Sequence, residues 1–478
     1  MKLIFILSLL CTIFPEKKGD FFYIGRFLYI NNISRTFNYL TVSTVDGFYV
    51  YDVSEDKLLM SSWVRGGVKY AVFYNDRVYL VTQDNRLAIY DDFLKRVEYT
   101  AFLHKPKSIG VNGEVIVVID GERMRFFSRD GLEMNSSQDT LGMFWCGEKV
   151  NLKGDDNSIL FLTPFKKYNP NIGWIDYSVF YPWMNLLYVG TMGDGIIIFD
   201  MQLKLPLDSL KLGLPEAEFR KILPCGKDLW VISKNSLTLI EDGPVFKYFI
   251  AQRTPFLSAN GFFDGAISGN KVFFLTEEGD LVSHDGSNWI VRKHVLDFPQ
   301  AVYSKDGTLY IAEEQKLKVI TEIGNIESIS IAGITEISSL GSFVLLLSKS
   351  GLYFLKGDSL FSFEDSLGYL NTEVLHISQY NSHMVTVVTS QGIINLKDNL
   401  DYEYFAPPFP PGSCVSLTTG KEKIVFGLKS GEIWILSIKD GSWTKYETPT
   451  PGVILSVYLK NEYFLYILTD LGLFLMRI

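Results

Sequence analysis

Carboxylate side chains recur at one position of a repeated pattern in the first half of the chain, in the short polar turn between two apolar runs. They are Asp46, Asp84, Asp120, Asp156 and Asp194. If these turns open on one face around a channel, the carboxylates converge, and grouped oxygen ligands attract Ca²⁺ or a cationic ligand. Asp is also a common turn residue because its side chain accepts hydrogen bonds from backbone N–H groups. The pattern therefore supports two interpretations, a Ca²⁺ or ligand site and plain turn formation.

A second group of candidate ligand-binding residues is aromatic. Large rings gather beside Gly and Pro in one short segment, at Tyr168, Trp174, Tyr177, Phe180, Tyr181 and Trp183. Such a segment suits a sugar-stacking platform or a protein hot spot, although packing between repeats is the alternative. Phe409 lies in the proline-rich segment 407–411 and is expected on an exposed loop.

Catalytic and metal-binding patterns are sparse. None of the five histidines stands two or four residues from another, as a metal site on one strand or helix would require. His376 alternates with apolar Leu375 and Ile377, which predicts a core position. No Gly-x-Ser-x-Gly motif and no C-x-x-C pair occurs among Cys11, Cys146, Cys225 and Cys414. No catalytic residue is assigned, and binding is favoured over catalysis.

The elements that must position these side chains form an internal repeat. An apolar strand, a polar turn that often holds Gly and a second apolar strand recur in 39–52, 343–356 and 424–436. The turn appears twelve times, about 39 residues apart. This spacing suits a four-stranded propeller blade, and the strand-rich segments lack the helices that solenoids of similar period need. The sequence predicts an all-β tandem β-propeller of about twelve four-stranded blades.

Rings of four to eight blades are usual, so two six-bladed rings are predicted. The longest spacing, 43 residues, follows the sixth turn and places the boundary between a first propeller at 21–243 and a second at 244–478. A division into seven and five blades is the alternative. Phe21–Tyr29 is a spare strand before the first hairpin, expected to pair outside its own blade and to close the first ring.

The N-terminus resembles an export signal. Met1 and Lys2 precede an apolar run, Leu3–Phe14, that ends at Pro15 and two lysines. The run is too short to span a bilayer, so an export signal at 1–15 and a protein that is periplasmic, at the cell surface or secreted are expected. A buried first strand and lipidation at Cys11 are the alternatives.

The chain has a net charge of −9 and no basic stripe, so nucleic acid is not an expected partner.

Short motifs resemble the propeller repeats of bacterial two-component regulators. In Gly213-Leu-Pro-Glu-Ala-Glu-Phe-Arg-Lys-Ile222 a Gly-Leu-Pro loop leads into an inner strand, and a Leu-Trp strand follows at 228–233; Asp285-Gly-Ser-Asn-Trp289 and Asp440-Gly-Ser-Trp443 are looser copies. The resemblance implies a propeller that senses extracytoplasmic ligands, commonly glycans. The chain departs from that family because no transmembrane helix or kinase follows its repeats.

Three functions remain open on the sequence. The favoured one is a non-catalytic extracytoplasmic binding or scaffold protein that engages a protein or glycan through propeller loop faces. A polysaccharide-active lyase or glycosidase is the second, and it would need paired acids in one cleft. The third is a detached ligand-sensing module of a signalling system.

The segment around Trp63 resembles a quinoprotein blade-docking motif, but the motif does not recur in the other repeats, so Trp63 is interpreted as a packing residue.

Overall fold

The computed structural model describes residues 21–478 apart from 37, 93–95, 113–114, 122, 138–150, 154–158, 163–164, 169–173, 182–185, 194, 201, 204, 242–245, 252, 322–323, 358, 364–372, 382 and 449–451. Contacts between residues divide the chain into two compact units. Unit 1 contains Phe22–Pro215, and unit 2 contains Glu216–Asp242 and Lys247–Ile478. The predicted export signal at 1–15 lies outside the described residues.

Unit 1 consists of five antiparallel sheets in chain order, as far as its described residues show. They are β2–β5 (Ile30–Thr36, Tyr39–Thr44, Gly47–Asp52, Lys57–Trp63), β6–β9 (Val68–Tyr74, Arg77–Thr82, Arg86–Asp91, Arg96–Phe102), β10–β13 (Pro106–Asn112, Val115–Asp120, Arg123–Phe127, Glu133–Ser137), the three-stranded β14–β16 (Asn151–Lys153, Ile159–Leu162, Phe165–Tyr168) and β17–β20 (Trp174–Tyr181, Leu186–Met192, Ile196–Asp200, Leu205–Leu210).

Unit 2 holds the remaining sheets, each of four strands. They are β21–β24 (Phe219–Cys225, Asp228–Ser233, Ser236–Ile240, Phe246–Ile250), β25–β28 (Phe262–Ser268, Lys271–Thr276, Leu281–His284, Trp289–Arg292), β29–β32 (Ala301–Lys305, Thr308–Ala312, Lys316–Ile320, Ile326–Ser330), β33–β36 (Ile334–Leu340, Phe343–Ser348, Gly351–Lys356, Ser359–Ser362), β37–β40 (Val374–Asn381, Met384–Thr389, Ile393–Lys397, Tyr402–Phe405), β41–β44 (Cys414–Thr419, Lys423–Leu428, Glu432–Ser437, Trp443–Glu447) and β45–β47 (Ile454–Lys460, Phe464–Thr469, Gly472–Arg477) with β1 (Phe21–Ile24). The strand β1 that completes the last of these sheets begins at Phe21, which belongs to unit 2, and its other residues belong to unit 1. The short 3-10 helix η1 (Pro411–Ser413) precedes β41.

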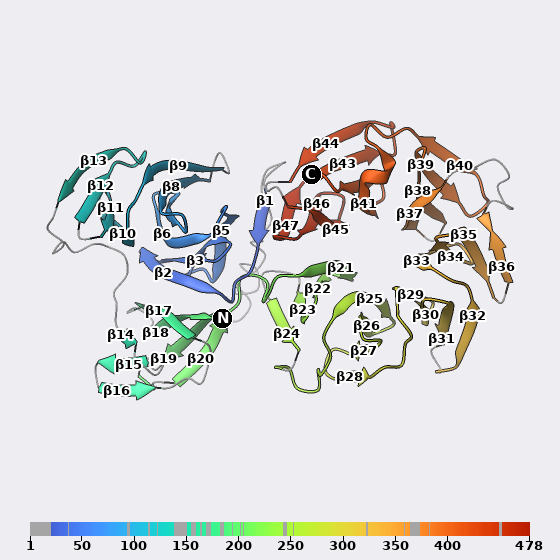
Figure 1. Ribbon diagram of the computed structural model, residues 1–478, viewed down its shortest axis with the longest axis horizontal. Coiled ribbons are helices and arrows are strands. Elements are labelled where there is room, and N and C mark those ends of the chain that lie inside the picture. Colours follow the sequence, from blue (N-terminus) through green and yellow to red (C-terminus); the bar gives the residue numbers. More distant parts are fainter. Residues whose placement is uncertain are drawn as a thin grey trace, which may run out of the picture. The chain divides into compact units, whose positions relative to one another are not determined.

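The sheets of each unit follow one another around a centre (Figure 1). In unit 2 the first strand of each sheet contacts the first strand of the next, from β21 through β25, β29, β33, β37 and β41 to β45, and β45 contacts β21 again. In unit 1, β2 contacts both β6 and β17. The first strand of each sheet is therefore the innermost one. A closed circle of four-stranded antiparallel sheets is a β-propeller, so the predicted fold class is confirmed.

Contacts divide the described sheets into five in unit 1 and seven in unit 2, with the boundary at Pro215/Glu216. The sequence predicts two six-bladed rings with a boundary at 243/244, and that division stays a prediction. The sheet β21–β24 belongs to unit 2, because the Ile222 N–H donates to Ser456 Oγ and Lys460 Nζ donates to the Lys227 carbonyl oxygen. The long spacing after the sixth turn corresponds to the connection at 251–261 between β24 and β25.

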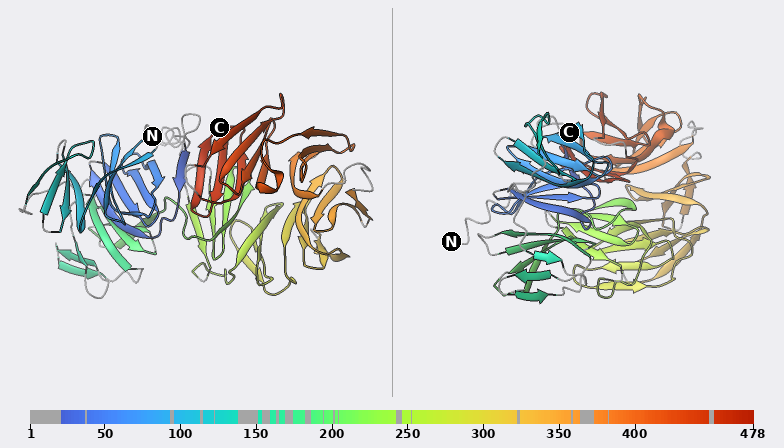
Figure 2. Two further views of the ribbon diagram at one scale, coloured as in Figure 1. Left: turned by 45° about the horizontal axis from the view of Figure 1, so that its top comes forward. Right: turned by 60° about the vertical axis from the view of Figure 1, so that its left-hand side comes forward.

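Strand β1 also departs from expectation. Phe21–Ile24 pairs outside its own repeat, as predicted, but it forms the fourth strand of the last sheet beside β47 (Figure 2). Phe21 packs edge-on against Phe474 of β47, with ring centroids 6.3 Å apart. The chain thus supplies the outermost strand of its last sheet from its N-terminal end, which leaves no missing strand there.

The core lies between neighbouring sheets. Between β33–β36 and β37–β40, alternate residues of each strand face the adjoining sheet, and Leu345, Leu347, Phe354, Val385 and Val387 are fully or almost fully buried. Each such side chain contributes about 1.5–3 kcal/mol through removal of apolar surface from water. No helix among the described residues is long and apolar enough to cross a membrane.

Candidate functional site

The turn aspartates of unit 1 are held by arginines. Arg26 forms a two-point contact with Asp46, whose side chain is 12% exposed; Nε lies 2.5 Å from Oδ2 and Nη2 contacts Oδ1. Asp84 accepts hydrogen bonds from Arg86 Nε at 2.7 Å and from Thr82 Oγ1 at 2.5 Å. The contact with Arg86 is the largest influence on the pKa of Asp84 and holds it below the usual value. These carboxylates stabilise local structure and carry their own counter-charges.

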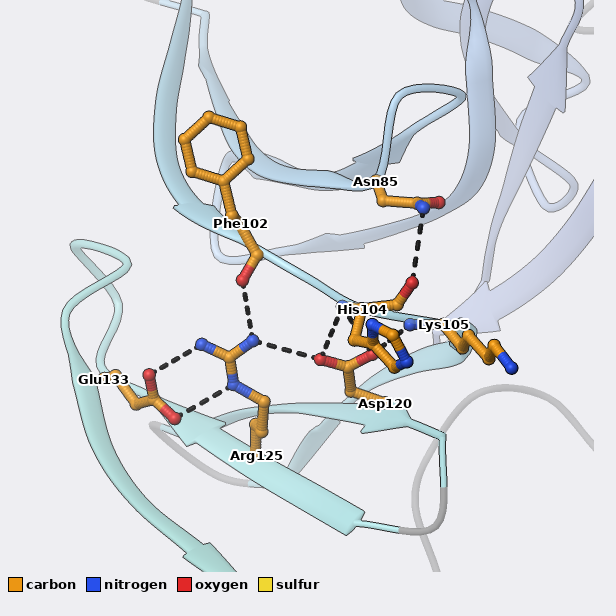
Figure 3. Close-up of polar contacts among 7 residues, drawn as sticks. All are labelled: Asn85, Phe102, His104, Lys105, Asp120, Arg125 and Glu133. Carbon is orange, nitrogen blue, oxygen red and sulfur yellow. Dashed lines mark hydrogen bonds and ion pairs between the residues drawn. The ribbon is translucent and has the colours of Figure 1, made fainter.

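Asp120 pins the connection between two sheets (Figure 3). Its carboxylate accepts hydrogen bonds from the backbone N–H groups of His104, at 2.8 Å, and Lys105, at 2.6 Å, and from Arg125 Nη1 at 3.0 Å. Burial raises its pKa, but these donors outweigh burial and the net pKa is lowered. Arg125 also contacts Glu133 at two points, 2.9 and 2.7 Å, so its guanidinium is satisfied. The arrangement is a structural clamp of β11 onto the chain entering β10.

The other predicted site residues are placed only in part. Asp156, Asp194 and Trp183 lie outside the described residues. Tyr168 ends β16, and Trp174, Tyr177 and Tyr181 lie in β17, where the backbone alone is described. In the part of the chain that is described, no three His, Cys, Asp or Glu side chains form a group that could hold a metal ion. The expected convergence of carboxylates is therefore not seen there.

Phe409 is buried and not exposed as predicted. Its side chain is 6% exposed and packs against Phe426, Trp434 and Trp443, with ring centroids 5.6, 6.0 and 5.7 Å away. The prolines around it direct the chain into η1, which turns the ring into the core between β37–β40 and β41–β44. Phe409 is a packing residue.

Polar side chains lie along the innermost strands of unit 2. The sequence analysis did not predict them as a group. Among the described strands, six of these innermost strands have a β-bulge near their first residue. In each of them the bulge lies between the first and the third residue of the strand. The six third residues, called here the bulge residues, are Lys221, Asp264, Glu336, His376, Ser416 and Ser456. Because a bulge inserts one residue and bends its strand, it re-aims the neighbouring side chain.

The bulge residues connect each innermost strand to the next. Asp264 Oδ2 accepts the Val302 N–H at 3.0 Å, and Lys221 Nζ contacts Asp264 Oδ1. Ser416 Oγ accepts the Val457 N–H at 3.1 Å, and Ser456 Oγ accepts the Ile222 N–H at 3.3 Å. The last of these bonds joins the last sheet to the first. Side-chain to backbone bonds thus run through much of the circle.

Glu336 and His376 make the densest of these contacts. His376 Nδ1 lies 2.6 Å from Glu336 Oε1, and its Nε2 lies 2.9 Å from the backbone oxygen of Cys414. Glu336 Oε2 accepts the Ile377 N–H at 2.8 Å. Strands β33, β37 and β41 are joined through one imidazole. His376 is partly exposed at 22% of its side chain, so the predicted core position is only half right.

A second polar string joins four adjacent sheets. Tyr303 of β29 donates its hydroxyl to Gln379 Oε1 of β37 at 2.6 Å and lies 2.9 Å from Ser339 Oγ of β33. Thr419 of β41 donates to the Gln379 backbone oxygen. The Tyr303 side chain of β29 therefore extends beyond the innermost strand β33 of the next sheet to β37 of the sheet after it. These contacts hold the innermost strands in place relative to one another.

The charged members of this ring contact one another. Asp264 contacts the cation Lys221, and Glu336 contacts His376, which is a cation when it is protonated. A carboxylate engaged by a cation is a poor general base, because its charged form is stabilised. Fixed donors and acceptors beside partly exposed Lys221, His376 and Glu336 suit hydrogen bonding to a polar partner.

A sequence signal for this ring exists. Each bulge residue is polar and stands directly before Ile, Leu, Val or Gly in an otherwise largely apolar strand, as in Ile334-Thr-Glu-Ile and Ile454-Leu-Ser-Val. The bonds from Asp264, Glu336 and Ser416 reach residues 38, 41 and 41 positions further along the chain, which is one repeat. A polar residue at the repeat period in an inner strand therefore marks a link between blades. Tyr177 of unit 1 also follows a bulge, but as the fourth residue of its strand.

Comparisons with known proteins bear on the fold alone. No family model and no curated protein matches the chain. The extracellular domain of a putative one-component system from B. thetaiotaomicron has 13% identity and a TM-score of 0.46, over 94% of this chain and 70% of that one. Virginiamycin B lyase from Staphylococcus aureus has 15% identity and a TM-score of 0.46, over 56% of this chain and 98% of that one. The WD40 β-propeller domain of Doa1 has 12% identity and a TM-score of 0.43, over 54% of this chain and 92% of that one.

Proposed function

We propose that this chain is a non-catalytic binding or scaffold protein that acts outside the cytoplasm, and that unit 2 engages a protein or glycan near its bulge residues. The observation that supports this is the ring of polar side chains on the innermost strands, held in place by bonds from sheet to sheet. Preorganised polar groups favour binding because little side-chain freedom is lost on complex formation.

Binding is favoured over hydrolysis by the state of the carboxylates. A glycosidase needs two carboxyl groups flanking one bond, one of them free to donate a proton. Asp264 contacts Lys221 and a backbone N–H, and Glu336 contacts His376 and a backbone N–H. The same holds in unit 1 for Asp120, which contacts Arg125 and two backbone N–H groups.

The proposal is tested by screening the full chain against a glycan array and against peptides from candidate partner proteins, followed by calorimetry on each hit. Lys221→Gln removes a partly exposed cation from the ring and should weaken binding about tenfold, the loss of a charged hydrogen bond. Lys271→Gln, at the start of β26 and outside the ring, is the matched control. Binding that is equal in both variants, or no ligand in either screen, contradicts the proposal.

Location is tested separately. The proposal expects an exported protein, so a C-terminally tagged chain produced in a bacterial host should appear outside the cytosol and lack its first residues by mass spectrometry. Full-length protein with Met1 intact in the cytosol would overturn this part.

A further inference from the structure

We infer that His376 is a proton-controlled clamp that joins strands β33, β37 and β41 at one end of the ring and releases β41 when it loses its proton. The clamp itself rests on geometry; only its effect on a ligand rests on the proposed function.

The two ring nitrogens of His376 both face acceptors. Nδ1 lies 2.6 Å from a carboxylate oxygen of Glu336, and Nε2 lies 2.9 Å from the backbone oxygen of Cys414. Neither oxygen can donate a proton when Glu336 is ionised. Because a neutral imidazole carries one N–H and the imidazolium carries two, only the charged form makes both bonds.

The surroundings favour the charged form. Burial is the largest single influence on the pKa of His376 and lowers it, but the hydrogen bond and charge of Glu336, with the Cys414 carbonyl, raise the net pKa above its ordinary value. From β41 the Cys414 thiol also faces this site, and burial raises the pKa of that thiol to about 12, so it stays neutral. Among the described groups, Glu336 is the one charge that acts on the imidazole.

The sign of the pH dependence follows. A histidine whose pKa is raised by folding contributes stability that is fully present below its unfolded value and is lost as pH rises through the folded value. When His376 loses a proton, Nδ1 keeps its hydrogen because it faces the charged Glu336 carboxylate. Nε2 is then left with a lone pair that faces the lone pairs of the Cys414 oxygen. The bond to β41 is lost and a repulsive contact replaces it.

The release is one-sided. Glu336 Oε2 keeps the Ile377 N–H, so β33 and β37 stay joined. At the other end of β37 and β41, the bond from Thr419 to the Gln379 backbone oxygen is independent of His376. Only the start of β41, directly after η1, loses a restraint. A ligand held at this end of the ring would therefore bind with an affinity that falls at alkaline pH.

The first readout needs no ligand. NMR titration of the five histidines, with His376 assigned by its absence in His376→Gln, should give His376 a pKa above about 6.5. Hydrogen exchange in 411–419, corrected for intrinsic rates, should rise across that transition by about tenfold for each unit of pKa elevation. Strand β44 (Trp443–Glu447), which pairs with β43 and not with β41, is the internal reference and should not change.

Two variants separate a proton switch from plain packing. Glu336→Gln removes the charge but keeps an oxygen for the Ile377 N–H, and it should move the midpoint of the exchange transition down by about one pH unit. His383→Gln removes the histidine that pairs with Asp398 on the same sheet and should leave the midpoint unchanged.

The clamp is contradicted if His376 titrates at or below the ordinary value, if exchange in 411–419 is independent of pH, or if Glu336→Gln leaves the midpoint in place. Should Glu336→Gln fail to fold, the wild-type titration and exchange decide the matter alone. If the clamp behaves as described and no ligand is found in the screens above, the proposed function fails while the clamp stands.

Discussion

Ser456 and Ile222 are 234 residues apart in the chain, yet the Ile222 N–H donates to Ser456 Oγ at 3.3 Å. The bond joins β45 of the last sheet to β21 of the first sheet of unit 2, where the circle closes. Closure removes the two exposed sheet faces that an open array of blades would leave in water, so a single polar contact there helps to define which sheets belong to the ring.

Ser456→Ala should destabilise unit 2 by about 1 kcal/mol. The substitution leaves the buried Ile222 N–H without its acceptor, and the cost of an unsatisfied buried donor exceeds that of the lost bond alone. Urea denaturation with a fluorescence readout of Trp230, a buried residue of the same sheet, measures the change. Ser328→Ala, on the exposed outer strand β32, is the control. Equal unfolding midpoints for the two variants would show that the closing bond contributes nothing.

Asp120→Asn should destabilise unit 1 by about 1–3 kcal/mol at neutral pH, because two backbone donors and Arg125 lose a charged acceptor. The pKa of Asp120 is lowered in the fold, so its contribution is present above the unfolded value and disappears as pH falls through the folded value. The stability difference between wild type and variant should therefore shrink toward acid pH in urea titrations. Asp76→Asn, at an exposed turn, should show no such convergence.

The repeat and its strands could be predicted from the sequence because both depend on local signals. In several hairpins a Thr three or four residues before the end of the turn bonds to the turn backbone, as Thr44 does with Gly47 and Thr389 with Gly392. These residues recur at the blade spacing. The period therefore follows directly from the physical chemistry of one tight turn.

The grouping of blades into units could not be predicted in the same way. Strand β21 could belong to the unit of β17 or to the unit of β45. Contacts between residues far apart in the chain, such as Lys460 and Lys227, decide this, and neither residue is unusual in its own repeat. The partners of the described turn aspartates could not be predicted for a related reason. Asp46 lies 20 residues from Arg26, so its counter-charge is not visible in the turn that contains it.

Ca²⁺ should leave the melting temperature unchanged. Asp46, Asp84 and Asp120 each contact an arginine, so a cation would have to displace an existing ion pair before binding there. Differential scanning fluorimetry in chelator and in millimolar Ca²⁺ checks this. A clear rise that Asp84→Asn plus Asp120→Asn abolishes would restore the metal-site interpretation.

Phe256 occupies a position that favours glycine. Pro255 and Phe256 are the central residues of a tight turn closed by the Leu257 N–H and the Thr254 oxygen at 3.1 Å, and Phe256 has φ of 64° with 85% of its surface exposed. A side chain in this left-handed region is strained, and an exposed ring gains little by burial. Phe256→Gly should therefore be more stable than Phe256→Ala by about 1 kcal/mol, since alanine keeps the strain. Urea denaturation of both variants measures the difference, and Leu257, which is buried, anchors the turn equally in each. An alanine variant at least as stable as the glycine variant would mean that the turn relaxes out of the left-handed region without cost.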